Sequence, residues 1–424
     1  MLTLNNLEYK DNGTKLVYDY TVLGDAKKFF NFQDPYYIKF NDDVSQTPKS
    51  IAVIPFLANM LPIAWFGNFN ISVEELDQDF YDAISKLKTE FQKQYPTYDL
   101  TGEILVNKKV KNVIAGGKSA MLFSGGVDAY ATYIRNFDKT PDLVTIHGAD
   151  IEIEDKKQWS DFVNFVETEN LLKRNNKKFI ETNVRTFYTY HVELLLKDLG
   201  WWGKVQHGLS LIGSLAPLAY VNNYASLFIA SSYTDFIDIA WGSTPAIDQS
   251  ITWAGITVHH DGYELKRQDK VDLITQFSKE KNVNFKLRVC YSELRDEFNC
   301  SNCEKCFRTI LGIILNGEDP NTYGFNVDGK VYQKLFRVLQ GGSASKGQQY
   351  FWWELMEKSK TCENPFIFED STQELNALER IKTGEIHNLL ESKIQNQNKT
   401  SSRIKFILMN KFSSFYKFYR NLRK

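Results

Sequence analysis

The sequence predicts an α/β protein with a doubly wound, mostly parallel sheet, a β-rich N-terminal module and a mainly helical C-terminal extension. From Gly117 onward, short apolar runs alternate with longer amphipathic stretches, a pattern typical of a parallel sheet with helices on both faces. Before that point, short runs of alternating polarity indicate strands. From about residue 330 the pattern is helical. A chain of 424 residues can hold three such regions, and we expect them at 1–115, 116–325 and 326–424.

In the N-terminal module, residues 15–20 and 36–40 alternate polar and apolar side chains and predict strands. Residues 72–94 predict a helix, because Ser72 and Glu75 have the spacing of a capping box and apolar residues follow at helical intervals. The longest apolar stretch, residues 51–66, contains two prolines and is short for a membrane span. It therefore predicts buried core.

In the middle region the expected elements follow one another in strand–helix order. Strands are expected at residues 120–123, 143–146, 178–180, 226–230 and 284–289. Helices are expected at residues 129–136, 158–175, 208–220 and 270–281. In such a sheet, ligands bind at the carboxyl ends of the strands.

In the C-terminal extension we expect helices and a loop at residues 341–345. Residues 401–424 carry seven Lys or Arg and no acid. Helical spacing divides this tail into an apolar and a polar face, formed by Ile404, Leu408, Phe415, Tyr419 and Leu422 and by Arg403, Asn410, Lys417 and Lys424. The tail fits a basic amphipathic helix for a membrane surface or an acidic partner, or a terminal helix docked on its own domain, which we prefer.

Charge and cysteine content narrow the class of protein. The net charge of −1 gives no whole-protein case for nucleic-acid binding. The N-terminus has no basic segment followed by an apolar core, so we expect no signal peptide and a cytoplasmic protein. Four of the five cysteines crowd between Cys290 and Cys306, which favours a metal site in a reducing compartment over a disulfide framework.

The most informative motif is Ser124-Gly125-Gly126-Val127-Asp128, between a predicted buried strand and a predicted helix. A glycine turn at a helix N-terminus exposes backbone N–H groups at the positive end of the helix dipole, where phosphate binds. The sequence therefore predicts a nucleotide site; a plain strand-to-helix turn is the simpler alternative.

The clustered cysteines, Cys290, Cys300, Cys303 and Cys306, have the spacing Cys-x9-Cys-x2-Cys-x2-Cys. Four thiolates can close a tetrahedral zinc site of the structural kind. An iron–sulfur cluster is the rival, although the Cys-Pro that completes the bacterial ferredoxin motif is absent. Four unligated buried thiols are the third alternative.

The glycine turn resembles the PP-loop of the ATP pyrophosphatase superfamily, whose usual form is Ser-Gly-Gly-x-Asp-Ser. Ser124, Gly125, Gly126 and Asp128 match, and the final serine is Ala129 here. The resemblance implies a PP-loop fold that holds ATP by its β- and γ-phosphates, with Val127 and His147, at a neighbouring strand end, as further ATP contacts. A missing hydroxyl at Ala129 removes one phosphate contact.

Together, the PP-loop and the cysteine motif ending in Cys-x-Arg are similar to the 7-cyano-7-deazaguanine synthase family over about residues 118–317, under half of the chain. This similarity implies ATP, Mg²⁺ and Zn²⁺, adenylation of a carboxylate with release of pyrophosphate, and amide or nitrile formation with ammonia. The family's substrate loop Gly-Tyr-Pro-Asp-Cys-Arg corresponds to Gly262, Tyr263 and Arg267, but its centre differs here. We therefore expect another carboxylate acceptor, small or macromolecular.

Further site residues are expected around this loop. Arg267 and Lys270, one helical turn apart, can face one anion, and Asp128 can serve Mg²⁺. Substrate contacts are expected from residues that open a helix or follow a strand: His207, Ser231 and Ser232. Arg308 is assigned either to the surroundings of the metal site or to the surface.

Two other functions stay open. A PP-loop RNA sulfur transferase would need a reactive cysteine, and only Cys362 lies outside the cluster. A non-catalytic nucleotide-binding module is the other, with Ala129 as the sign of lost turnover. The terminal regions would supply acceptor specificity or a protein partner, and a homo-oligomer is compatible with the sequence.

Overall fold

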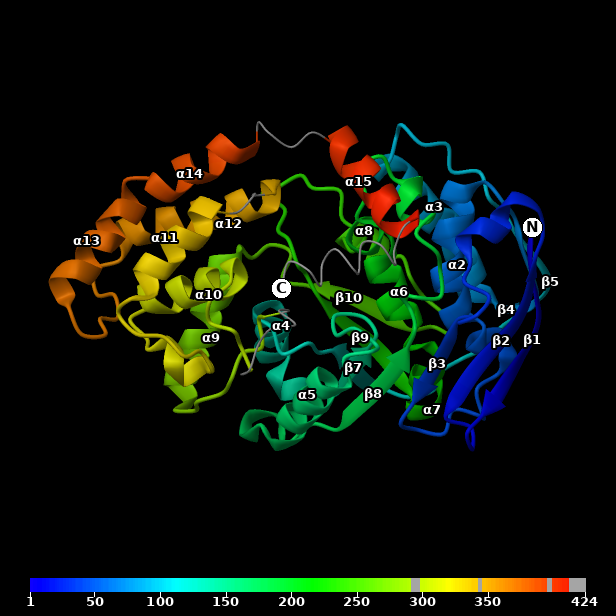
Figure 1. The fold of residues 1–424 in the computed structure, drawn as a ribbon. Coiled ribbons are helices and arrows are strands. Elements are labelled where there is room, and N and C mark those ends of the chain that lie inside the picture. Colours follow the sequence, from blue (N-terminus) through cyan, green and yellow to red (C-terminus); the bar gives the residue numbers. More distant parts are fainter. Residues whose placement is uncertain (291–297, 342–344, 395–398, 412–424) are drawn as a thin grey trace.

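The protein is described by a computed structural model over residues 1–290, 298–341, 345–394 and 399–411. Within these residues it is an α/β structure with a ten-stranded, mostly parallel sheet in the order β10-β9-β6-β7-β8-β3-β2-β1-β4-β5 (Figure 1). None of the helices in the described ranges is long and apolar enough to span a membrane.

Five parallel strands form the half of the sheet that carries the glycine turn. They are β6 (Lys118–Leu122), β7 (Asp142–His147), β8 (Lys177–Thr182), β9 (Tyr224–Ala230) and β10 (Thr257–Asp261). β6 lies between β7 and β9, so the chain moves outward from β6 first in one direction and then in the other. This reversal is the topological switch point of doubly wound sheets, where a crevice opens outside the strand ends.

The N-terminal strands extend the same sheet. They are β1 (Leu2–Lys10), β2 (Lys15–Val22), β3 (Tyr37–Phe40), β4 (Ile71–Asp77) and β5 (Ile104–Val110). β3 joins the two halves by pairing antiparallel with β8, with Ile38 opposite Thr182 and Phe40 opposite Ile180. The sheet is therefore continuous across residue 115.

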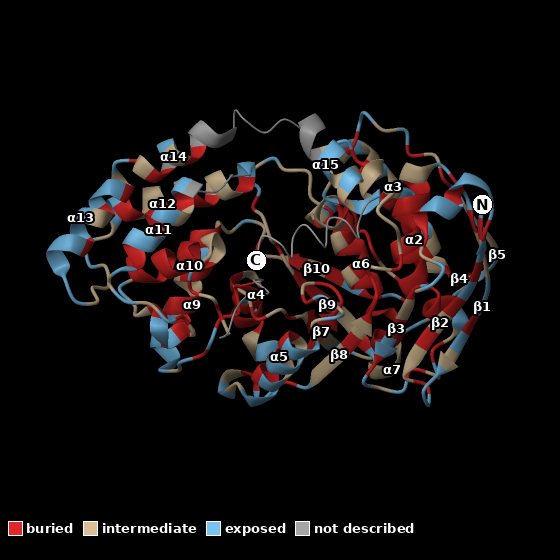
Figure 2. Ribbon diagram, in the orientation of Figure 1, coloured by how far each residue is buried: buried red, intermediate tan, exposed pale blue. Residues whose placement is uncertain are grey.

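Helices cover both faces of the parallel strands, as the sequence predicts. Adjacent β6 residues point to opposite sides: Ala120 packs in one core and Met121 in the other. The first core includes residues of α1 (Lys49–Ala52), α2 (Ile54–Gly67), α6 (His207–Gly213) and α7 (Ala216–Asn222). The second includes residues of α4 (Val127–Arg135), α5 (Lys156–Thr168), α9 (Arg267–Lys281) and α10 (Glu304–Leu315). Figure 2 shows these buried layers in red.

The C-terminal extension is helical, as predicted, with α11 (Val331–Gly341), α12 (Lys346–Thr361), α13 (Ser371–Lys382) and α14 (Glu385–Ile394) gathered beside α9 and α10 (Figure 1). Most of the predicted loop at residues 341–345 lies outside the described residues.

Two further helices lie outside this extension: α3 (Gln78–Gln94) in the N-terminal region and α8 (Pro245–Asp248) between β9 and β10.

The basic tail begins as α15 (Lys399–Lys411), which lies apart from α14. Arg403 donates hydrogen bonds to the carbonyls of Leu194 and Leu196, so this part of the tail is docked on the protein. Arg403, from the predicted polar face, makes this contact, whereas Ile404 and Leu408, from the predicted apolar face, are 54% and 52% exposed. The predicted face residues from 412 onward lie outside the described residues.

The predicted helix at residues 72–94 begins too early. Residues Ile71–Asp77 instead form β4, which pairs in parallel with β1 and β5. The helix starts only after Asp77, whose carboxylate accepts a hydrogen bond from the N–H of Phe80 at 3.1 Å. Residues 71–77 therefore form a strand because they pair with β1 and β5, and the helix begins after Asp77 because this residue caps it. The capping-box spacing of Ser72 and Glu75 does not start a helix here.

Three predictions in the middle region also need correction. The helix at 208–220 is divided into α6 and α7, and Pro217, which has no N–H to donate, lies in the first turn of α7. The helix at 158–175 ends at Thr168 and is followed by a short 3-10 turn. Residues 284–289 form no strand, because N–H groups there bond to loops: Leu287 to the Tyr323 carbonyl and Arg288 to the Gly125 carbonyl.

Candidate nucleotide site and metal centre

A cavity of about 480 Å³ opens at the carboxyl ends of β6, β7 and β9. Its wall includes Ser124, Asp128 and Ala129 from the glycine turn and the start of α4. The position is the switch-point crevice described above. The volume lies within the range of small-molecule sites.

The glycine turn has the strand–turn–helix geometry that the sequence predicts. Gly125 has a φ of +73°, a left-handed conformation that favours glycine, and Gly126 is the N-cap residue of α4. The Gly125 carbonyl accepts a hydrogen bond of 2.7 Å from the N–H of Arg288, which fixes the turn against residues 284–290. Val127 is fully buried and anchors the first turn of α4.

Arg267 and Lys270 converge on one anion, as their spacing predicts, and that anion is Asp128. Arg267 pairs with one carboxylate oxygen, and the Lys270 ammonium lies 3.2 Å from the other. Lys270 also donates to the carbonyl of Ser231 at 2.6 Å. Burial acts to raise the pKa of Asp128, but the two cations outweigh it and lower the pKa to about 2. Asp128 thus orients Arg267 and Lys270, and each of its oxygens already has one cationic partner.

The cavity wall carries five basic side chains beside four acidic ones, which are Asp128, Asp150, Glu152 and Asp155. Its positively charged side chains come from four separate segments and are Arg185, Arg267, Arg288, Lys305 and Arg308. Burial, followed by repulsion from Arg267, lowers the pKa of Lys305 to about 7. The sequence assigned Arg308 either to the surroundings of the metal site or to the surface. The structure places it in the wall of the cavity. Asp150 and Glu152 also line it and offer carboxylate oxygens, the ligands that Mg²⁺ prefers.

Sequence reasoning missed three of these cations, Arg185, Arg288 and Lys305. Arg185 follows the end of β8 by three residues, so the strand-end rule that selected Ser231 was sufficient to find it. Lys305 and Arg308 are three positions apart on a helix that begins at the cysteine motif, and this spacing predicts a shared face. Arg288 carries no comparable signal, because residues 284–289 form no regular element.

Five aromatic side chains also line the cavity: Trp202, His207, Tyr233, Trp241 and Phe351. The ring centroid of His207 lies 5.5 Å from that of Trp202 and 5.3 Å from that of Trp241. Its Nδ1 is buried and has no hydrogen-bond partner in the described residues. Burial lowers the pKa of His207, so its ring is neutral near pH 7. Ser232 lines the cavity as well.

Other predicted site residues lie elsewhere. His147 is fully buried and stacks on Trp159 with ring centroids 4.7 Å apart, and Thr145 and Ile146 line the cavity in its place. Ser231 directs its hydroxyl to the Tyr233 carbonyl, and it reaches the site only through its own carbonyl, which holds Lys270.

The predicted substrate loop contributes a single residue to the cavity wall. Gly262 has a φ of +79° and forms a turn, and Tyr263 packs near His260. Neither residue is part of the wall, whereas Arg267 is.

The four cysteines meet at one point. The sulfurs of Cys290, Cys300, Cys303 and Cys306 all lie within 4.8 Å of one another, with pairs at 3.5, 3.8 and 4.0 Å. A tetrahedron with zinc–sulfur bonds of about 2.3 Å has edges of about 3.8 Å, so the cluster fits a tetrathiolate site. These four residues can therefore hold a metal ion.

No family model, no curated protein and no solved structure matches the chain.

Proposed function

We propose that the protein is a PP-loop ATP pyrophosphatase that adenylates a carboxylate acceptor, releases pyrophosphate and forms an amide or a nitrile. The acceptor is expected to differ from that of the 7-cyano-7-deazaguanine synthases. The observation that carries this proposal is the glycine turn at the switch point, which opens into a cavity lined by five basic side chains. Arg267 is paired with Asp128, and the other four can meet a polyanion, since fixed cations stabilise charge that develops on transferring phosphoryl groups.

The reaction can be followed through residues of this chain. Backbone N–H groups of the turn hold the phosphates, and the cations in the wall neutralise them. An acceptor carboxylate oxygen attacks the α-phosphorus, and the bond to the bridging oxygen breaks as pyrophosphate leaves. Ammonia then attacks the acyl carbon, loses a proton and displaces AMP to give an amide. A second round on the amide oxygen, with loss of AMP and protons, gives the nitrile.

The group formed by Arg185, Trp202 and His207 suits the acceptor. Arg185, whose guanidinium lies 5.3 Å from the Trp202 ring centroid, offers a positive charge for a carboxylate. The neutral His207 ring, with its unpartnered Nδ1, offers a further hydrogen bond. Mg²⁺ would meet Asp150 and Glu152, and zinc in the cysteine cluster would have a structural role, because four thiolates leave no open position.

ATP–pyrophosphate exchange tests the proposal directly. The protein is incubated with Mg-ATP, labelled pyrophosphate and a panel of carboxylic acids, and products with ammonia are identified by mass spectrometry. We expect label in ATP only with a suitable acid, and we expect AMP and an amide or a nitrile as products. Replacing Arg185 by Gln should remove acid-dependent exchange while ATP binding stays. Absence of exchange with every acid would argue against adenylation.

A non-catalytic nucleotide-binding module is the second candidate, and Ala129 favours it. This residue lines the cavity where the resemblance implies a serine hydroxyl. ATP would then stabilise the protein in a thermal shift without being cleaved. RNA sulfur transfer has less support. Cys362, at the end of α12, donates its thiol hydrogen to the carbonyl of Leu315 and does not line the cavity.

The setting of the reaction is part of the same proposal. We expect a cytoplasmic enzyme that receives ammonia from another source. The N-terminal strands and the C-terminal helices would contact a macromolecular acceptor or a protein partner, or mediate homo-oligomer formation.

A further inference from the structure

The metal centre and the nucleotide site share two chain segments. Residues 284–290 end at Cys290, and within them Arg288 donates its N–H to the carbonyl of Gly125 in the glycine turn. α10 begins at the other side of the cluster, with Cys303 as its N-cap and Cys306 in its first turn. The cluster therefore fixes both a segment that holds the glycine turn and the start of α10.

The first turns of α10 carry two of the cavity's cations. Lys305 lies between Cys303 and Cys306, and Arg308 lies two residues after Cys306; both line the cavity. Arg308 is 7% exposed, and its guanidinium lies 4.3 Å from the Phe351 ring centroid. Its Nε and Nη1 are buried and form no hydrogen bond with the described residues, and its nearest acid, Glu304, is 3.9 Å away. A buried guanidinium with unmet donors is costly unless an anion completes it.

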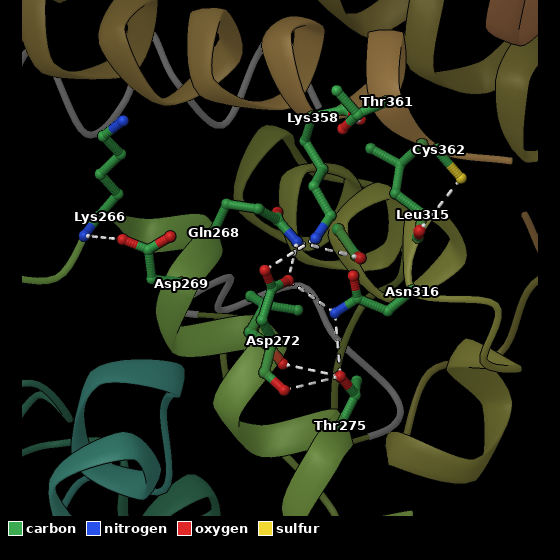
Figure 3. Close-up of polar contacts among 12 residues, drawn as sticks. Lys266, Gln268, Asp269, Asp272, Thr275, Leu315, Asn316, Lys358, Thr361 and Cys362 are labelled. Atoms are coloured by element: carbon green, nitrogen blue, oxygen red, sulfur yellow. Dashed lines mark hydrogen bonds and ion pairs between the residues drawn. The ribbon is translucent and has the colours of Figure 1, made fainter.

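The position of α10 is fixed from its outer side as well. The two carboxylate oxygens of Glu304 accept hydrogen bonds from Trp352 at 2.9 Å and from Gln348 at 3.4 Å, both on α12. Farther along, Asp272 on α9 accepts from Asn316, which follows α10, and from Lys358 on α12 (Figure 3). The start of α10 is therefore held from two sides, by the cysteine cluster and by α12.

We propose that Arg308 and Lys305 form the subsite for the pyrophosphate end of the nucleotide, and that metal in the cysteine cluster holds this subsite against the glycine turn. This inference rests on the proposed use of ATP. It names the residues that hold the leaving pyrophosphate and gives the metal a role in positioning them. A metal that fixes α10 in the binding position favours pyrophosphate binding, and thermodynamic linkage makes this coupling reciprocal.

Inorganic pyrophosphate with excess Mg²⁺ is the probe for the subsite. Calorimetry is performed on the zinc-loaded full-length protein and on Arg308→Gln, with Lys286→Gln as the matched control, since Lys286 is an exposed cation on the segment that ends at Cys290. We expect at least about tenfold weaker binding by Arg308→Gln, because charge-assisted hydrogen bonds to phosphate are lost, and unchanged binding by Lys286→Gln. Elemental analysis and circular dichroism establish that each variant keeps its metal and fold. Arg308→Lys, which keeps the charge, replaces Arg308→Gln if the latter does not fold, and we expect it to bind more weakly than wild type.

The coupling is measured as the rate at which zinc passes to a colorimetric chelator, with and without Mg-pyrophosphate. We expect pyrophosphate to slow the transfer several-fold in wild type and to have no such effect in Arg308→Gln. Direct capture of zinc by pyrophosphate affects both proteins equally and is thereby removed from the comparison.

The outcomes separate this inference from the proposed function. Equal pyrophosphate affinity in wild type and Arg308→Gln would overturn the subsite, and an unchanged zinc-transfer rate would overturn the coupling; ATP–pyrophosphate exchange would survive both results. Failure of wild type to bind either pyrophosphate or ATP would instead remove the proposed function and the subsite with it.

Discussion

At the scale of single residues, Ala129 is the point where this chain departs from the motif that it resembles. The residue is 3% exposed and lines the cavity beside Asp128. In the proposed nucleotide complex, a hydroxyl added there would face the cavity and could donate a hydrogen bond to a phosphate, whereas the methyl group of Ala129 has no donor. The departure can therefore be tested by restoring the serine.

We predict that Ala129→Ser tightens nucleotide binding by about 1 kcal/mol, or roughly fivefold, through one added hydrogen bond. Calorimetry with a non-hydrolysable ATP analogue measures the change. Ala131→Ser is the control, because it adds a buried hydroxyl to the same helix at a position outside the cavity wall. Weaker binding by Ala129→Ser would mean that the cavity needs the smaller side chain.

Glu354 gives a second residue-scale prediction, on pH. This carboxyl is 4% exposed and accepts a hydrogen bond of 3.0 Å from the N–H of Gln268 in the first turn of α9. Burial raises its pKa from 4.5 to about 7. Between these values the folded protein holds the proton more firmly than the unfolded chain, so stability decreases as pH rises from 4.5 to 7.

Glu354→Gln removes this titration while keeping an oxygen acceptor for Gln268. We predict that the variant unfolds like wild type at pH 4.5 but is more stable at pH 8, by up to about 3 kcal/mol. Urea unfolding at the two pH values measures the difference. Glu357→Gln, an exposed position on the same helix, should show no such pH dependence. Equal stability of Glu354→Gln and wild type at pH 8 would mean that this carboxyl is ionised at little cost.

At the scale of elements, Asp272 connects the three helices that carry the cation wall and its neighbours. Its Oδ1 accepts from Asn316 at 2.8 Å and from Gln268 at 2.9 Å, and its Oδ2 accepts from Lys358 at 2.8 Å. α9, α10 and α12 are therefore joined at one partly exposed carboxylate, as Figure 3 shows.

We predict that Asp272→Ala lowers the free energy of unfolding by about 1–2 kcal/mol, a modest value because solvent screens the Lys358 pair. It should also weaken pyrophosphate binding a few-fold, because α9 and α10 lose a shared support. Denaturant unfolding and calorimetry measure the two effects. Asp272→Asn keeps one acceptor and should lie between wild type and Asp272→Ala. Unchanged pyrophosphate binding by Asp272→Ala would show that these contacts do not support the cavity.

Elements were predictable from sequence where local pattern and burial agree. β6, β7, β8, β9 and α4 follow from short apolar runs and glycine punctuation, whereas β10 was not predicted. β4 could not be found in this way, because its pairing with β1 and β5 decides it and these contacts are not local. The site divides likewise: motifs predict the glycine turn and the cysteines, whereas Arg288 reaches the cavity from an irregular segment.

At the scale of the whole molecule, the N-terminal strands and the parallel strands that carry the glycine turn share one sheet and one core. β3 pairs with β8, and the face of β6, β7 and β9 that holds Ala120, Val144 and Leu227 packs in the same core as α2. The sequence predicts a separate module for residues 1–115. It could not reveal the shared sheet, because pairing between distant strands leaves no signal in the local sequence pattern.

A chain that begins at residue 116 would expose this face and the edge of β8. α2 is mostly apolar on the buried side, with Phe56, Leu57 and Met60 at 0% exposure, so its loss would leave the apolar residues packed against it in water. We predict that the fragment 116–424 shows no cooperative thermal transition and binds a hydrophobic dye. Co-expression with the fragment 1–115 should restore the transition, because the missing face and strand pairing are then supplied in trans. A cooperative, nucleotide-binding fragment 116–424 on its own would show instead that the N-terminal strands are an addition to a self-sufficient domain.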